Sequence, residues 1–193
     1  MEKEFWEIYK SQIFLLISNK ENEIWEIIHN INNKNLLYST HIVNYVEQLI
    51  ISYIYISKMI GNQLPYNNTK DFFCYCNPEG VYEYENFNLN EEHKIQNDSY
   101  EDKLIFLLRH TEGEICKLIF DVLNDNDDDP HFSAVYCSNM IKCFMDISSA
   151  IGCSLLYNDI CGFFIAHGFC LNQYYDFENK RKIESDCYRG VQY

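Results

Sequence analysis

Three residues near the carboxyl end have the side-chain chemistry of zinc ligands. Cys161, His167 and Cys170 lie close together in the chain, and Cys187 follows as a candidate fourth ligand. Structural zinc sites usually show paired Cys or His ligands at short, regular spacings. These residues lack such pairs, so we favour apolar-face thiols and an ordinary histidine. We therefore expect no metal site and no cofactor.

A run of carboxylates offers a second metal chemistry, because calcium is bound by oxygen ligands. The run is Asp125-Asn126-Asp127-Asp128-Asp129, and Pro130 follows it. A calcium-binding hand needs Gly at loop position 6 and Glu at position 12, where this chain has Pro130 and Tyr136. Asp129 followed by Pro130 is instead typical of a helix start, with Asp as the N-cap. The run favours a solvated capping loop, with a partner-facing acidic patch as the alternative.

Covalent catalysis is a third chemistry to consider, because the chain has nine Cys and six His. A Cys–His nucleophile pair needs only to meet in space, so the sequence leaves it open. The chain has no phosphate-loop, dinucleotide-binding, nucleophile-elbow or zinc-peptidase motif. We predict no catalytic residues and a protein that is not an enzyme. A metal-dependent enzyme that uses Cys161, His167 and Cys170 is kept as a third hypothesis.

Residues 71–129 combine aromatic side chains with a strong negative charge. From Glu79 to Asp129 there are 15 acidic and four basic side chains, which give −11 of the net charge of −14. Aromatic residues are enriched at interface cores, so this segment is suited to a basic protein partner. The alternative is that the aromatic residues hold the loop on the helices. The predicted partner-binding residues are Phe72, Phe73, Tyr75, Tyr82, Glu83, Tyr84, Glu85, Asp125, Asp127 and Asp128.

The remaining charge argues against two other classes of partner. Phosphate contacts need clustered Lys and Arg, and the only basic cluster is Lys180-Arg181-Lys182, so we expect no nucleic acid. The most apolar window, 42–60, is interrupted by polar and charged residues, so we expect a buried helix and no membrane span. The amino terminus lacks the features of a signal peptide, which favours reduced thiols and a cytoplasmic protein.

Hydrophobic spacing predicts the elements that hold these residues. We expect an all-α, single-domain bundle of six or seven helices with a long acidic loop at 62–98 and no internal repeat. The helix over about 40–60 is apolar over most of its circumference, so it should be central, and Gly61 is a typical residue after a helix end. The predicted parts are an N-terminal helical extension at 1–38, a helical core at 39–175 and a polar tail at 176–193. The predicted helices cover 2–18, 21–32, 40–60, 99–123, 130–155 and 160–169.

Two segments resemble a known family. The segment Val46-Glu47-Gln48-Leu49-Ile50-Ile51-Ser52-Tyr53-Ile54-Tyr55-Ile56-Ser57 resembles the first core helix of the Bcl-type intracellular immunomodulators of poxviruses. The segment Ile147-Ser148-Ser149-Ala150-Ile151-Gly152-Cys153 is similar to an element that those proteins carry about 90–100 residues later. The tryptophans usual after both segments are absent, and so is the Leu-x-x-x-Gly-acid death motif, which argues against direct binding to cell-death regulators.

The resemblance implies a viral, non-enzymatic inhibitor of host innate immune or cell-death signalling that acts through protein–protein contact. The charge suggests an alternative, an acidic immunity-type protein that neutralises a basic toxin through fast, salt-dependent association. The nature of the partner distinguishes the two hypotheses.

Overall fold

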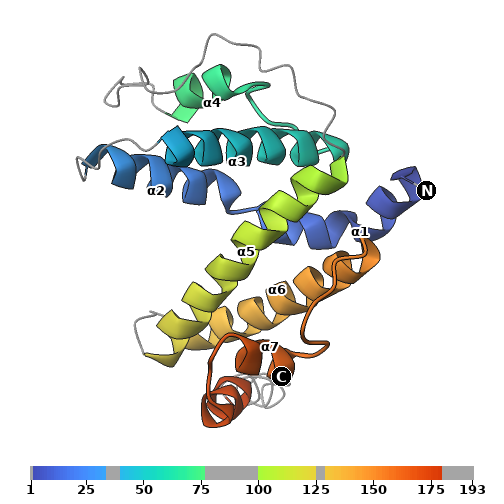
Figure 1. The fold of residues 1–193 in the computed structure, drawn as a ribbon, viewed down its shortest axis with the longest axis vertical. Helices are drawn as coiled ribbons and strands as arrows, with labels where there is room; N and C mark the ends of the chain where they lie inside the picture. Colours follow the sequence, from blue (N-terminus) through green and yellow to red (C-terminus); the bar gives the residue numbers. More distant parts are fainter. Residues whose placement is uncertain (1, 34–39, 77–99, 125–128, 180–193) are drawn as a thin grey trace, which may run out of the picture. The chain divides into compact units, whose positions relative to one another are not determined.

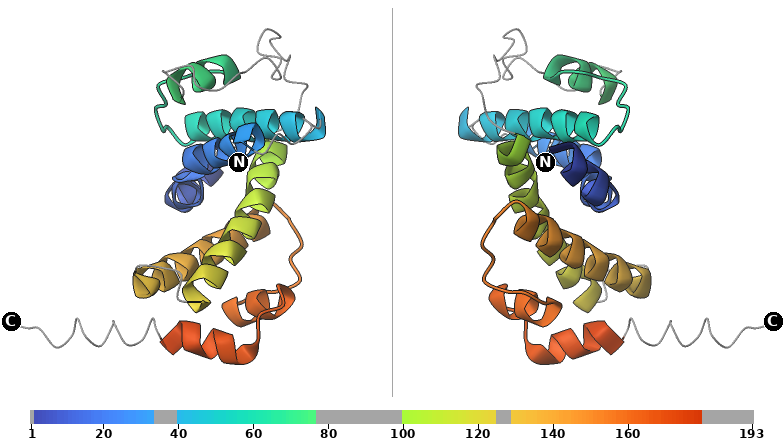
Figure 2. Two further views of the ribbon diagram at one scale, coloured as in Figure 1. Left: turned by 90° about the vertical axis from the view of Figure 1, so that its left-hand side faces the viewer. Right: turned by 90° about the vertical axis from the view of Figure 1, so that its right-hand side faces the viewer.

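The computed structural model describes residues 2–33, 40–76, 100–124 and 129–179 (Figure 1). Every regular element within these residues is helical, which confirms the predicted all-α class. Residues 171–179 are also helical and follow the last labelled helix (Figure 2). The labelled helices are α1 (Glu2–Ile17), α2 (Lys20–Asn33), α3 (Thr40–Met59), α4 (Thr69–Cys76), α5 (Tyr100–Leu123), α6 (Pro130–Ala150) and α7 (Ile160–Ala166).

Residue contacts divide the chain into two compact units. The first unit is Met1–Leu107 and the second is Leu108–Tyr193, so α5 begins in one unit and ends in the other. This division differs from the predicted extension, core and tail.

In the first unit α3 is the central helix, as its apolar circumference predicts. It packs against α1, α2 and α4. A buried helix needs apolar side chains on several faces, and α3 has them because three neighbours share it. The fully buried side chains of this unit include Ile13, Ile24, Ile28, Val46, Leu49, Ile50, Ile56 and Phe72.

The start of α5 also packs on α3. The ring centroids of Tyr55 and Tyr100 are 6.2 Å apart, and those of Tyr45 and Phe106 are 5.3 Å apart. The Lys103 ammonium lies 5.1 Å from the centroid of the Tyr55 ring, a cation–π contact. Tyr55, near the end of α3, meets the first residue of α5, and Tyr45, near the start of α3, meets Phe106 farther along α5. The two helices therefore run in opposite directions at this contact.

In the second unit α6 packs against α7. The predicted N-cap of α6 is confirmed, because the Asp129 carboxylate accepts a hydrogen bond from the Phe132 amide at 3.1 Å and Pro130 opens the helix. The segment 171–179 closes the unit through Phe177, whose ring lies 5.1 Å from that of Phe164. Other buried side chains are Ile115, Ile119, Val122, Ala134, Cys137, Ile141, Ile147 and Phe163.

The two units share a sequence repeat with a spacing of 91 residues, so the expectation of no internal repeat is wrong. Residues 56–73 and 147–164 are identical at nine of 18 positions. The shared pattern is Ile-Ser-x-x-Ile-Gly-x-x-Leu-x-Tyr-Asn, followed after four residues by Phe-Phe. The ends of α3 and α6 and the starts of α4 and α7 are also 91 residues apart.

Both copies end their long helix with the same hydrogen bonds. The Gly61 amide donates to Lys58 O at 3.1 Å, and the Asn62 amide donates to Ser57 O at 2.8 Å. The corresponding bonds of Gly152 and Cys153, to Ser149 O and Ser148 O, have the same lengths, 3.1 and 2.8 Å. The φ angles of Gly61 and Gly152 are 76° and 77°. This is a Schellman C-cap, in which glycine takes the left-handed position without a steric penalty.

The next helix also begins in the same way in both copies. The Asn68 side chain accepts from the Asp71 amide at 2.8 Å, and the Asp159 side chain accepts from the Gly162 amide at 2.6 Å. An Asn or Asp N-cap satisfies an amide that has no partner inside the helix.

Two predicted boundaries need correction. Residues 69–76 lie in the predicted loop but form α4, because two helical turns are too short to show a hydrophobic period. The helix predicted to reach 155 ends at Ala150, since Gly152 turns the chain. The rest of the predicted loop, at 77–98, and residue 99 of the helix predicted over 99–123 lie outside the described residues.

Replacing Gly152 by Ala should lower the free energy of unfolding by about 1–2 kcal/mol, the approximate cost of a left-handed residue with a Cβ. Gly113→Ala is the matched control, because Gly113 lies inside α5 and an added Cβ meets no atom within 4 Å at either site. The control should raise stability by about 1 kcal/mol. Urea denaturation followed by circular dichroism measures both, and equal effects at the two sites would contradict the assigned turn.

Candidate functional site

A hydrogen bond between a tyrosine and a glutamate occurs once in each copy of the repeat. The Tyr66 hydroxyl donates to Glu21 Oε2 at 2.5 Å, and the Tyr157 hydroxyl donates to Glu112 Oε1 at 2.5 Å. The separation within each pair is 45 residues. Tyr66 follows α3 and Glu21 belongs to α2, while Tyr157 follows α6 and Glu112 belongs to α5. Each bond therefore ties the loop after the long helix to the preceding helix.

Burial and the carboxylate neighbour fix the protonation of both tyrosines. Burial raises the pKa of Tyr66 and of Tyr157 well above the usual range, and the adjacent Glu21 or Glu112 raises each pKa further. The pKa of Tyr53, which hydrogen-bonds Tyr66, is also raised by burial. The Tyr66 and Tyr157 hydroxyls therefore stay protonated at neutral pH. Each donates its hydrogen bond to a carboxylate, and the charge of the carboxylate strengthens that bond.

A third side chain completes each cluster, and it differs between the copies. His167 Nε2 lies 3.1 Å from Glu112 Oε1, close enough for an ion pair when His167 is protonated, although Nε2 makes no hydrogen bond within the described residues. Its counterpart 91 residues earlier is Cys76. Burial raises the pKa of the Cys76 thiol to about 11, and Glu21 adds to the shift. The same position thus holds an imidazole in one unit and a protonated thiol in the other.

The candidate zinc ligands Cys161, His167 and Cys170 do not form a metal-binding cluster within the described residues. His167 faces Glu112, and the described part of the chain has no group of three or more His, Cys, Asp or Glu side chains that could hold a metal. Cys187 lies outside that part. Burial raises the pKa of Cys116 to about 11, with Glu112 adding to it, and burial also raises the pKa of Cys143. Low thiolate content makes these two weak nucleophiles at neutral pH.

Two of the predicted partner-binding residues belong to the core. Phe72 and Phe73 are only 0% and 1% exposed, so the prediction that they face a partner is corrected. The Phe72 ring lies 5.1 Å from that of Tyr66, and α4 packs on α3. Phe72 and Phe73 therefore fit the alternative interpretation, in which the aromatic residues hold this segment on the helices. Their burial is repeated at Phe163 and Phe164.

Tyr75 is the predicted partner-binding residue that the structure places at the surface. Its side chain is 55% exposed, and its ring centroid lies 5.6 Å from that of the buried Tyr66. Cys74 and Asp71 are exposed on the same short helix. The predictions for Tyr82, Glu83, Tyr84, Glu85, Asp125, Asp127 and Asp128 lie outside the described residues.

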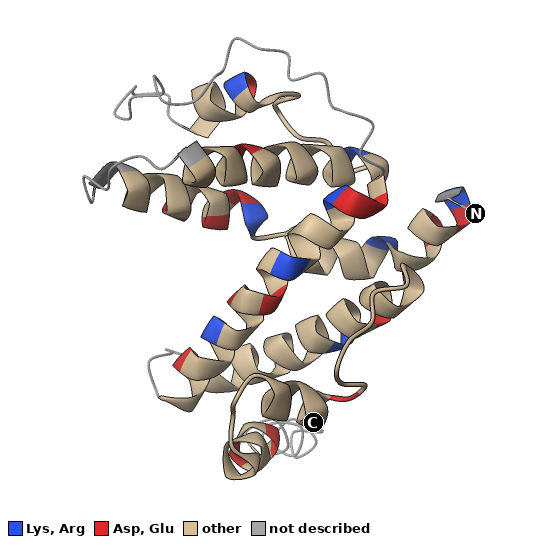
Figure 3. Cartoon of the chain, in the orientation of Figure 1, with Lys and Arg blue, Asp and Glu red and all other residues tan. Residues whose placement is uncertain are grey.

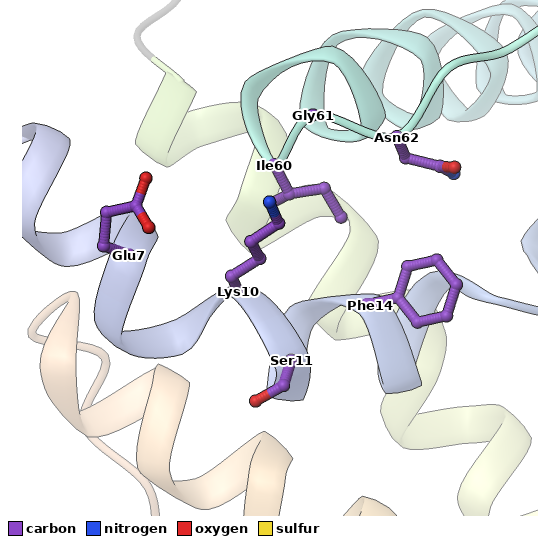
Figure 4. Close-up of a pocket in the computed structure, with 7 residues that line it drawn as sticks. All are labelled: Glu7, Lys10, Ser11, Phe14, Ile60, Gly61 and Asn62. Carbon is purple, nitrogen blue, oxygen red and sulfur yellow. The ribbon is translucent and has the colours of Figure 1, made fainter.

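A pocket of about 510 Å³ lies between α1 and the end of α3 (Figure 4). Glu7, Lys10, Ser11 and Phe14 line it from α1, and residues 60–62 line it from the end of α3. The Lys10 side chain points toward the end of α3, where a cation interacts favourably with the helix dipole (Figure 4).

Charge in the described residues is mixed along the helices. Figure 3 shows acidic and basic residues interspersed along α5. No helix in the described part is long and apolar enough to cross a membrane.

Comparison of the chain with protein-family models, with curated proteins and with solved structures found no match. The site is therefore interpreted from its own residues. The glutamate–tyrosine pairs escaped the sequence analysis, although the 91-residue spacing of Tyr66 and Tyr157 was a signal that could have found them.

Replacing Tyr157 by Phe should lower the free energy of unfolding by about 1 kcal/mol, because a part-buried hydrogen bond to a carboxylate is lost. Tyr66→Phe should cost about as much. Tyr175→Phe is the control, since that side chain is 60% exposed. Denaturant titration checks the three variants, and an unchanged midpoint for Tyr157→Phe would show that the bond does not stabilise the fold.

Alkylation should distinguish the thiols by their surroundings. Cys76 and Cys116, with pKa values of about 11, should react slowly with iodoacetamide at neutral pH and faster as pH rises toward 11. The exposed Cys74 and Cys170 should be modified first at neutral pH. Peptide mass spectrometry after timed labelling measures the order. Rapid labelling of Cys76 at pH 7 would contradict its assigned environment.

Proposed function

We propose that this protein is a non-enzymatic protein–protein interaction module, and that its partner-facing surface includes the exposed side of α4. The observation that carries the proposal is Tyr75. It is an exposed aromatic residue held against a buried Tyr66, four positions before the strongly acidic segment 79–129. Aromatic side chains with such support are typical anchors of interfaces.

Comparison of the two copies supports this assignment. The framework residues Tyr66, Phe72 and Phe73 recur 91 positions later, whereas the counterpart of Tyr75 is Ala166. The shared scaffold therefore does not need an aromatic side chain at this exposed position. A role in partner recognition would account for an aromatic residue at this position in the first unit alone.

The net charge of −14 favours a partner with a basic surface. The resemblance to poxviral immunomodulators makes inhibition of host innate immune or cell-death signalling the specific role that we propose. The elements behind that resemblance lie one internal repeat apart, since Ile56-Ser57 and Ile147-Ser148 are counterparts. The spacing is thus accounted for by duplication, and the viral role rests on the similarity of the segments themselves.

Affinity capture with the purified chain tests the proposal. The wild type and Tyr75→Ala would be incubated with eukaryotic cytosol and with bacterial lysate, at low and high salt, and bound proteins identified by mass spectrometry. Tyr175→Ala, which removes an equally exposed tyrosine, is the matched control. Recovery of a signalling protein at high salt supports the inhibitor. Recovery of a basic toxin that is lost at high salt supports the immunity-type alternative instead.

For the partner identified, Tyr75→Ala should weaken binding about tenfold, as expected for loss of an aromatic anchor. Tyr175→Ala should leave the affinity unchanged. Titration calorimetry with purified proteins gives both values, and equal affinities for wild type and Tyr75→Ala would place the interface elsewhere.

A further inference from the structure

The contact between α3 and the start of α5 has counterparts elsewhere in the repeat. Residues 100–107 of α5 correspond to residues 9–16 of α1, 91 positions earlier. The correspondence is visible in burial, because Leu104 and Leu107 are buried in α5 as Ile13 and Leu16 are in α1. The start of α5 and the second half of α1 are therefore two versions of one helix.

The face of α3 that contacts the start of α5 also has a counterpart in the second unit, on α6. The counterparts of His41, Tyr45 and Tyr55 on α3 are Phe132, Tyr136 and Asp146 on α6. Phe132 is 66% exposed, and its ring stacks on that of Tyr136 with a centroid distance of 6.3 Å and an interplanar angle of 11°. Asn139, Lys142 and Asp146 are exposed farther along the same helix. We refer to the side of α6 with Phe132, Tyr136, Asn139 and Asp146 as the α6 outer face.

Ile8 on α1 is a large apolar residue whose side chain is 63% exposed. Tyr9 and Leu15 are half-buried, and the 50% exposed Phe14 lines the pocket beside the end of α3. An exposed apolar side chain beside the half-buried Tyr9 and Leu15 suits a surface that another molecule covers.

We propose that the α6 outer face binds α1 of a second copy of this chain, in the manner in which α3 binds the start of α5. The occupant follows from the repeat, because α1 is the other version of the helix that α3 binds. The proposal does not depend on the proposed function.

The side chains that this pairing brings together are complementary. Leu15 is the counterpart of Phe106, which packs on Tyr45, so Leu15 would meet the aromatic pair at the start of α6. Tyr9 and Gln12 are the counterparts of Tyr100 and Lys103, which meet Tyr55. In the second copy these two donors would meet the Asp146 carboxylate, an acceptor. Where α3 has Tyr55, α6 has Asp146, which is an acceptor. Where α5 has Lys103, α1 has Gln12, which keeps a hydrogen-bond donor for that acceptor.

The proposed contact joins two different surfaces, so it is heterologous. Such contacts continue from copy to copy as an open assembly unless the rotation closes a ring. Each molecule would offer one α1 surface and one α6 outer face. Blocking either surface should stop the assembly from growing. A molecule blocked on its α1 surface and a molecule blocked on its α6 outer face should still form one dimer through their intact surfaces.

Sedimentation velocity of the full chain over a range of concentrations tests this. Wild type should form larger species as concentration rises. Ile8→Asp, on α1, and Phe132→Asp, on α6, should each remain monomeric, and an equimolar mixture of the two should give a dimer. Phe120→Asp is the matched control, because Phe120 is 58% exposed on α5 and outside both surfaces, and it should associate like wild type.

Circular dichroism first verifies that each variant keeps its helical content, with Ile8→Ser and Phe132→Ser used in place of any aspartate variant that does not. A wild-type chain that stays monomeric up to its solubility limit would overturn the proposal. So would association that survives either single substitution, or a mixture of the two variants that stays monomeric.

Discussion

A hydrogen bond from a tyrosine to a glutamate ties the loop after the long helix to the preceding helix in each unit. Tyr66 and Tyr157 each lie in the irregular segment between a long helix and a short one, where backbone hydrogen bonds are few. Without this bond, the segment would rely on its Schellman turn and on the paired phenylalanines that follow. With it, the short helix is fixed against the core, and the exposed residues of that helix are presented on a defined base.

The sequence predicted the parts of the fold that depend on local signals. The Asp129-Pro130 start of α6, the Gly61 end of α3 and the central position of α3 all follow from capping preferences and apolar periodicity. The short helix α4 was missed because its residues pack through Phe72 and Phe73, adjacent positions that show no helical period. Of the predicted contact residues, Tyr75 is exposed, whereas Phe72 and Phe73 are buried. Composition does not separate a buried aromatic residue from an exposed one.

The internal duplication explains which residues belong to the scaffold and which do not. Tyrosine, glutamate, the turn glycine and the phenylalanine pair are kept in both copies, and each has a structural contact. Some positions that differ lie on the surface or beside the glutamate, such as Tyr75 against Ala166 and Cys76 against His167. Others lie in the core, where one apolar side chain replaces another, as Cys137 replaces Val46. Hydrogen-bonded pairs 45 residues apart could not be recognised from periodicity, because no local pattern links them.

A tandem copy of one scaffold also creates a hazard during folding. Each short helix, with its tyrosine and its phenylalanine pair, has two similar long helices in the same chain on which it could dock, and exchange of this kind is a known failure of repeat proteins. Half of the positions between 56 and 73 differ from their counterparts, which gives each segment a preference for its own unit. Synthesis from the amino terminus also reduces such exchange, because the first unit can fold before the second unit has been synthesised.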